Sequence, residues 1–198
     1  LAKSMVDNFA YQITHYGKIL NANRSYYLTR TQPPFYSSMI REVYEAMPVK
    51  DLNWLQEKLQ ICIKEYETVW METGKRLTEN GLNRYFAQGI GLPPETESGH
   101  YDEILEPFAK ASNLSIPEYE KLYYQRKIAN SELDAYFVHD RSVRESGHDT
   151  SYRLEGICAS LNAVELNAML YKYETDFAEI ISFYFNNNYE YNNTNYTH

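Results

Sequence analysis

Residues 131–153 read Ser-Glu-Leu-Asp-Ala-Tyr-Phe-Val-His-Asp-Arg-Ser-Val-Arg-Glu-Ser-Gly-His-Asp-Thr-Ser-Tyr-Arg. The first half of this stretch is amphipathic with helical spacing, Ser131 suits the N-cap, and Gly147 suits the left-handed turn that ends a helix. The stretch therefore predicts a helix from about 131 to 147, with Asp149 just beyond its end. Two arginines and a second carboxylate lie within one or two turns. A carboxylate held in that setting suits a general acid or base, and the alternative is a capped helix end that carries surface ion pairs.

The rest of the chain is also patterned as helices. Apolar residues recur at three- and four-residue steps and predict helices over about residues 2–19, 34–46, 52–72, 99–112 and 162–185. Ser115-Ile116-Pro117-Glu118 is a capping box, which predicts the start of a short helix that ends before Asn130. Almost no alternating strand pattern occurs, so the sequence predicts an all-α protein of six or seven helices with long irregular loops.

Two segments lack helical periodicity. Residues 75–97 carry several glycines and the pair Pro93-Pro94, and a loop of this length in a compact domain is usually functional or disordered. Its apolar centre predicts that it is anchored and that it runs over the mouth of a site. Residues 186–198 are an Asn/Tyr/Thr-rich run after a domain that spans residues 1–185. The run predicts either a disordered low-complexity tail or sequence foreign to the domain at a truncation point.

Composition excludes several classes of function. The net charge of −8 and the pI near 5.2 argue against a nucleic acid or an anionic membrane surface as partner, and no run is long and apolar enough to span a membrane. The five histidines are scattered, and there is no Cys/His ligand spacing, phosphate-binding loop or nucleophile elbow. We therefore expect no metal and no cofactor. Cys62 and Cys158 are expected to be reduced, structural residues.

Three segments carry a resemblance to a known family. Residues 144–153 closely resemble the segment of trehalases, glycoside hydrolase family 37, that carries the catalytic aspartate. Asn21-Ala22-Asn23-Arg24-Ser25-Tyr26-Tyr27-Leu28-Thr29-Arg30-Thr31-Gln32-Pro33-Pro34 resembles the family's second sugar-binding segment, and Leu92-Pro93-Pro94-Glu95-Thr96 resembles a third. His148, where many members have tryptophan, resembles the fungal neutral branch. That branch is cytosolic, so the resemblance implies a cytoplasmic protein.

The resemblance implies hydrolysis of α,α-trehalose to two glucose molecules with inversion, through two carboxyl groups roughly 6.5–9.5 Å apart. Asp149 matches the general acid, which needs burial or a nearby carboxylate to stay protonated near neutral pH. Glu95 could supply that charge. The matching positions that contact sugar in the family are Asn21, Arg30, Thr31, Gln32, Glu95, Arg144 and Gly147. The alternative is a non-catalytic helical domain that binds sugar or serves as a scaffold.

The resemblance also implies the architecture. Trehalases are (α/α)6 toroids of six inner and six outer helices, so a chain with about half that number resembles an internal fragment of the catalytic domain. The family's first signature and its catalytic base are absent from this sequence, and the chain alone is expected to be inactive. Arg30, Glu95 and Asp149 are expected to converge on one concave surface that binds trehalose. The sequence makes no prediction of an oligomeric state.

Overall fold

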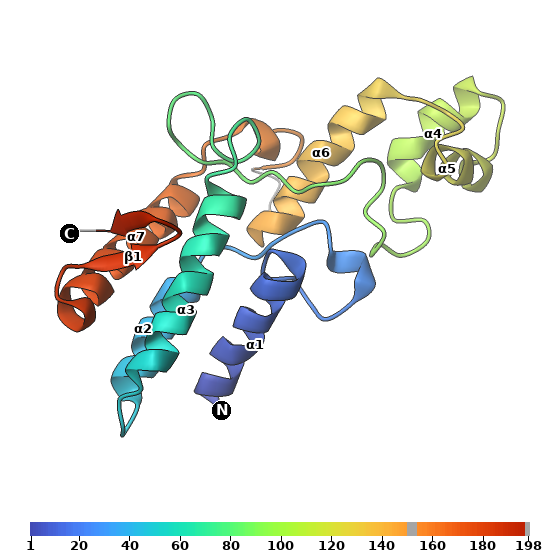
Figure 1. Ribbon diagram of the computed structural model, residues 1–198. Helices are drawn as coiled ribbons and strands as arrows, with labels where there is room; N and C mark the ends of the chain where they lie inside the picture. The colour runs from blue at the N-terminus through green and yellow to red at the C-terminus, as the bar shows by residue number, and fades with distance from the viewer. Residues whose placement is uncertain (150–153, 197–198) are drawn as a thin grey trace.

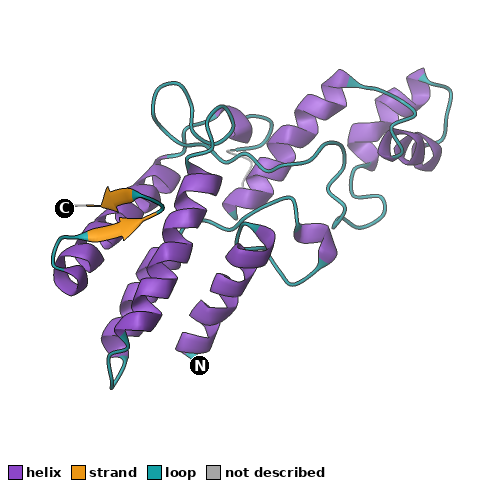
Figure 2. Cartoon of the chain, viewed as in Figure 1, coloured by secondary structure: helices purple, strands orange, loops and turns teal. Residues whose placement is uncertain are grey.

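The helical pattern of the sequence appears as helices in the computed structural model, which describes residues 1–149 and 154–196. The α-helices of this described part are α1 (Ala2–Tyr16), α2 (Tyr36–Ala46), α3 (Leu52–Glu65), α4 (Asp102–Ala111), α5 (Ile116–Tyr124), α6 (Ser131–Ser146) and α7 (Val164–Phe185) (Figure 1). Two short strands, β1 (Tyr189–Tyr191) and β2 (Thr194–Tyr196), pair as an antiparallel hairpin (Figure 2). The predicted all-α class is therefore confirmed.

Four helices form the larger of two packed groups. α2 lies against α1, α3 and α7, and α1 also contacts α3. The apolar stripes of these helices meet in one core, where Val6, Ile40, Leu55 and Leu59 are completely buried. Burial of such side chains stabilises a fold by about 1.5–3 kcal/mol each, so the three- and four-residue spacing of apolar residues is sufficient to explain this half of the structure.

The smaller group consists of α4, α5 and the first half of α6. Its core contains Leu105, Tyr119, Tyr123, Leu133 and Phe137. The predicted capping box is present at the start of α5, where the backbone N–H and the hydroxyl of Ser115 both donate to Glu118. Figure 1 shows this group at one end of the molecule and the first group at the other, with the second half of α6 between them.

A third cluster lies where α6 ends. Val143 packs there with Trp70, Tyr85 and Leu166, which come from the turn after α3, the long loop and α7. α6 ends at Gly147, whose φ of 78° lies in the left-handed region as the sequence predicts. The irregular segment after α3 lies over the end of α6, and it connects the two helical groups.

Two local features differ from the sequence-based expectation. The N-cap of α6 is Asn130, whose side-chain oxygen accepts from the N–H groups of Glu132 and Leu133, whereas Ser131 is the first helical residue. In the segment expected to be disordered, the structure has the β1–β2 hairpin. Asn192 and Asn193 form its turn with φ of 49° and 59°, values that asparagine tolerates better than most residues and that a two-residue hairpin turn requires.

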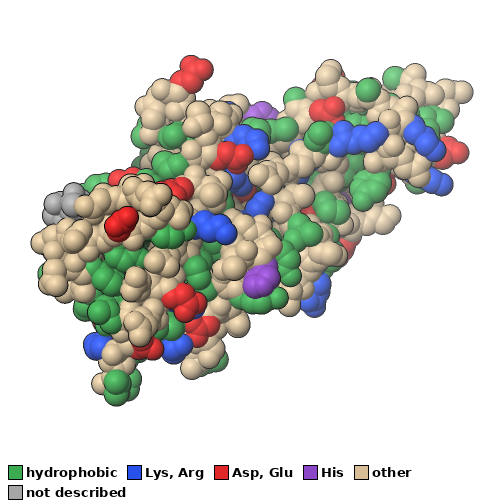
Figure 3. All heavy atoms as spheres, viewed as in Figure 1, with side chains coloured by type: hydrophobic (Ala, Val, Ile, Leu, Met, Phe, Trp, Pro, Cys, Tyr) green, Lys and Arg blue, Asp and Glu red, His purple; other side chains and the backbone are tan. Residues whose placement is uncertain are grey.

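On the face drawn in Figure 3, acidic and basic side chains are interspersed. Within residues 1–149 and 154–196, no helix has both the length and the apolar character needed to cross a membrane. Cys62 and Cys158 are both buried and free, as expected of reduced, structural residues.

Candidate active site

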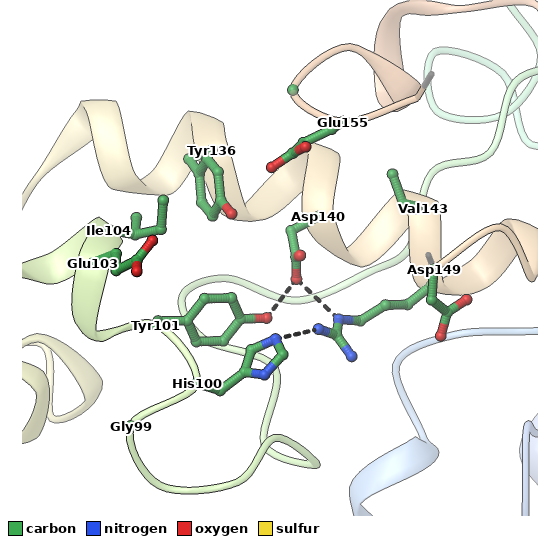
Figure 4. A pocket seen from close by; sticks show the side chains of 12 residues that line it. Gly99, His100, Tyr101, Glu103, Ile104, Tyr136, Asp140, Val143, Asp149 and Glu155 are labelled. Atoms are coloured by element: carbon green, nitrogen blue, oxygen red, sulfur yellow. Dashed lines mark hydrogen bonds and ion pairs between the residues drawn. The ribbon is translucent and has the colours of Figure 1, made fainter. Parts of the chain in front are cut away.

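A cleft of about 480 Å³ opens between the N-terminal end of α4 and the second half of α6 (Figure 4). Its wall includes His100, Tyr101, Asp140, Arg144, Asp149 and Glu155. All six of these side chains are charged or can form hydrogen bonds. A cleft with this lining suits a polar ligand with many hydroxyl groups.

Arg144 is held at the centre of this wall. Its Nε donates to Oδ2 of Asp140 at 3.0 Å, and the same oxygen accepts from the hydroxyl of Tyr101 at 2.6 Å. The Nη2 of Arg144 lies 3.1 Å from Nε2 of His100. Burial disfavours the charge of Arg144, but the neighbouring carboxylates, chiefly Asp140 and more weakly Glu95, outweigh it and raise its pKa. The guanidinium is therefore a fixed, fully charged donor.

Asp149 stands at the edge of the cleft, two residues beyond Gly147. The left-handed backbone at Gly147 turns the chain away from the helix axis, and the N–H of His148 donates to the hydroxyl of Ser146 at 3.1 Å. The side chain of Asp149 is exposed to solvent. Burial was one of the two expected means of keeping this carboxyl protonated, and the described residues do not provide it.

Arg30 and Glu95 form a buried ion pair. Nη1 of Arg30 lies 3.0 Å from Oε1 of Glu95, and the two side chains are only 7% and 9% exposed. The guanidinium of Arg30 also lies over the ring of Tyr27, 5.0 Å from its centroid. The charge of Glu95, which was expected to act on Asp149, is thus compensated by Arg30. The charge of Glu95 also contributes, more weakly than that of Asp140, to the raised pKa of Arg144.

The side chains of the two residues after Arg30 differ in their exposure to solvent. Gln32 donates through Nε2 to Oδ1 of Asn21 at 2.7 Å, and both side chains have solvent-accessible surface. Thr31 is fully buried, with its hydroxyl donating to the carbonyl of Ile19 at 3.1 Å. The predicted sugar-binding residues Asn21 and Gln32 are therefore brought together, whereas Arg30 pairs with Glu95 and the Thr31 side chain points into the protein.

Glu145, which was not among the residues expected at the site, connects these segments. Glu145 is completely buried and accepts four hydrogen bonds: two from Arg76, at 3.0 and 2.7 Å, one from the N–H of Thr31 at 3.2 Å and one from the N–H of Phe86 at 3.0 Å. It therefore fixes the Arg30 segment and the long loop to α6.

A second missed residue, Arg141, donates from Nη2 to the carbonyl of Gly89 at 2.6 Å. The sequence contained a signal for both residues. Leu133 and Phe137 lie on the buried face of α6, and the next two positions at the same four-residue spacing are Arg141 and Glu145. The buried face of α6 therefore changes from apolar to charged along the helix.

Comparison with known proteins shows which family the chain resembles. The trehalase family model matches residues 1–198. The chain is 49% identical over 195 residues to the cytosolic neutral trehalase of Kluyveromyces lactis, and 51% identical over 192 residues to that of Neurospora crassa. Each match covers 96% of this chain and 26% of the relative, so the chain spans about a quarter of the length of these curated relatives.

Among solved structures, neutral trehalase Nth1 from Saccharomyces cerevisiae matches 100% of this chain and 37% of its own, with a TM-score of 0.93 and 46% identity. The helices described above therefore correspond to part of an (α/α)6 toroid. A family match over the full length, together with this structural agreement, establishes that the chain belongs to the trehalase family.

Proposed function

We propose that this chain is the acid-bearing part of a trehalase that hydrolyses α,α-trehalose to two glucose molecules with inversion, in the cytosol. The observation that carries the proposal is the position of Asp149, at the rim of the same polar cleft that the fixed guanidinium of Arg144 lines. The names of the relatives, cytosolic neutral trehalases, support the substrate and the compartment.

In the proposed reaction, Asp149 donates its proton to the oxygen that bridges the two glucose units, and the bond from that oxygen to one anomeric carbon breaks. A carboxylate from outside these 198 residues removes a proton from water, which attacks the same carbon from the opposite face. The sugar hydroxyls form hydrogen bonds with the side chains of Asn21, Arg30, Gln32 and Arg144. The exposed Asp149 requires that the remainder of the enzyme, or the substrate itself, cover the cleft and remove water from it.

The test is the Asp149→Asn substitution in the full-length polypeptide that carries this segment. An amide has nearly the same shape as the acid but cannot deliver the proton, and loss of general acid catalysis costs about 10²–10⁴-fold in rate. Glucose release from trehalose measures the effect. Glu155→Gln is the matched control, because Glu155 is another exposed carboxylate on the same cleft, and its rate should stay within about threefold of wild type. Equal rates for Asp149→Asn and wild type would refute the assignment.

The isolated 198-residue chain should release little or no glucose, because water activation needs the second carboxylate. Robust turnover by the isolated chain would mean that a carboxylate within it serves as the base. The second candidate function is a non-catalytic sugar-binding domain, which the exposure of Asp149 favours. Trehalose binding without turnover by the full-length wild type would establish that alternative.

A further inference from the structure

Asp140 joins the two walls of the cleft through a single oxygen atom. Its Oδ2 accepts from Nε of Arg144, one turn further along α6, and from the hydroxyl of Tyr101 at the start of α4 (Figure 4). The side chains of Asp140 and Arg144 are 19% and 16% exposed, so solvent screens this pair less than a typical surface pair. Burial and the Asp140 carboxylate raise the pKa of Tyr101, so its hydroxyl stays protonated and keeps donating.

His100 provides the second point of attachment. Because all N–H groups of Arg144 are donors, the 3.1 Å contact between Nη2 and Nε2 of His100 requires a lone pair on that nitrogen. Nε and Nη2 of the guanidinium are thus each fixed by a different partner, which sets the plane of the group. The remaining N–H groups are left for a ligand in the cleft.

An arginine side chain loses considerable rotamer entropy when a ligand immobilises it. If the protein has already fixed the guanidinium, substrate binding does not pay that cost, and the donors stand at the correct place for the sugar hydroxyl. Neither of the two partners of Arg144, Asp140 and His100, belongs to the segments that resemble the sugar-binding motifs of the family. Both nevertheless hold Arg144, which is the cleft residue that the resemblance places in contact with sugar.

We propose that Asp140 is a positioning residue for trehalose hydrolysis: it fixes the guanidinium of Arg144 in the orientation that binds substrate, and Tyr101 in turn fixes Asp140. The inference rests on the proposed function and deepens it. Asp140 acts only through Arg144 and does not touch the substrate.

The chain contains a matched control on the same helix. Asp134 of α6 also accepts a hydrogen bond from a tyrosine, Tyr123, at 2.6 Å, and like Asp140 it is half-buried. No arginine contact with Asp134 occurs among the described residues. If Asp140 served only to hold a tyrosine and two helices together, Asp134→Asn and Asp140→Asn would have the same consequences.

The experiment is a double-mutant cycle in the full-length polypeptide, with Asp140→Asn and Arg144→Gln, measured as kcat and KM for trehalose. The asparagine can still accept from Tyr101 but carries no charge for Arg144. We expect Asp140→Asn to lower kcat/KM by roughly 10- to 100-fold, mostly through KM, since a misplacement of about 1 Å costs up to about 100-fold. Adding Asp140→Asn to Arg144→Gln should change kcat/KM by less than about threefold, because residues that act as a unit are not additive.

Binding gives a second readout that needs no turnover. In the Asp149→Asn background, trehalose binding measured by calorimetry should weaken on Asp140→Asn, and Asp134→Asn should leave it unchanged. Circular dichroism and the melting temperature check that each variant is folded. Additive effects of Asp140→Asn and Arg144→Gln, or equal effects of Asp140→Asn and Asp134→Asn on kcat/KM and binding, would overturn the inference while leaving trehalose hydrolysis intact. Absence of both turnover and binding in the wild type would instead refute the proposed function and this inference with it.

Discussion

Glu145→Gln should destabilise the fold more than its single-atom change implies. Each carboxylate oxygen of Glu145 accepts from one Arg76 nitrogen and one backbone N–H. Oε1 accepts from Nε of Arg76 and from the backbone N–H of Phe86, and Oε2 accepts from Nη2 of Arg76 and from the backbone N–H of Thr31. Whichever way the amide of glutamine is turned, its NH2 group faces two donors. The side chains of Arg76 and Glu145 are 1% and 0% exposed, so water cannot replace the lost acceptor.

The magnitude follows from this burial. Breaking a buried ion pair by removing one charge costs about 3–5 kcal/mol, because the partner is left uncompensated. Besides the oxygen of the glutamine amide, the described residues leave Arg76 a 3.6 Å approach to Glu72, a 3.5 Å contact with a carbonyl oxygen and the ring of Trp70. For a chain of this size, about 3–5 kcal/mol corresponds to a melting temperature lower by roughly 6–20 °C.

The assay is urea unfolding of the chain followed by circular dichroism, with Glu72→Gln as the control. Glu72 approaches the same arginine, but its side chain is 29% exposed, so its loss should cost less than about 1 kcal/mol. If Glu145→Gln and Glu72→Gln have unfolding free energies within about 0.5 kcal/mol of each other, the buried charge does not hold this junction together and the reasoning fails.

Two further predictions concern stability. Burial raises the pKa of Glu65 to about 7, against the opposing effects of Tyr173 and Arg76. Between the ordinary pKa of 4.5 and this raised pKa, the folded state keeps a proton that the unfolded chain has lost. The free energy of unfolding should therefore fall by roughly 3 kcal/mol as the pH rises through this range, and level off above it. Glu65→Gln should abolish that slope in urea midpoints taken from pH 5 to 8, and an unchanged slope would exclude Glu65 as its source. Asn130→Ala removes the acceptor for two N–H groups of α6 and should lower the free energy of unfolding by about 1 kcal/mol. Ser131→Ala should lower it less, and a larger loss for Ser131→Ala than for Asn130→Ala would mean that Ser131 is the N-cap.

Much of the fold followed from local rules. The apolar stripes predicted all the α-helices but α5, which the Ser115 capping box predicted, and Gly147 predicted where α6 ends. These features could be predicted because a helix is decided by spacing and by the capping residues at its ends, all of which lie within a few positions of one another in the chain. Each segment that resembles trehalases is likewise a continuous stretch of sequence, so the residue types that it offers to a site could be predicted before its position in the fold was known.

The C-terminal run carries a local signal that its composition hides. The residues from Tyr189 to Tyr196 have a low-complexity composition, yet their alternating tyrosines flank two consecutive asparagines. Tyr189 is buried against the α3–α7 core, and this contact gives the hairpin a stability that two isolated strands do not have in water. Composition alone could not predict that burial.

What the sequence by itself determined was the set of helices, their ends and the residue types offered to the site. Only the tertiary structure decided which charges meet: Arg30 with Glu95, Arg144 with Asp140 and His100, and Arg76 with Glu145, 69 positions away. The physical reason is that an arginine or glutamate on a helix has the same local pattern whether it faces solvent or a buried partner. Its energy depends on desolvation and on the distance to the opposite charge, and both quantities exist only once distant segments have packed together.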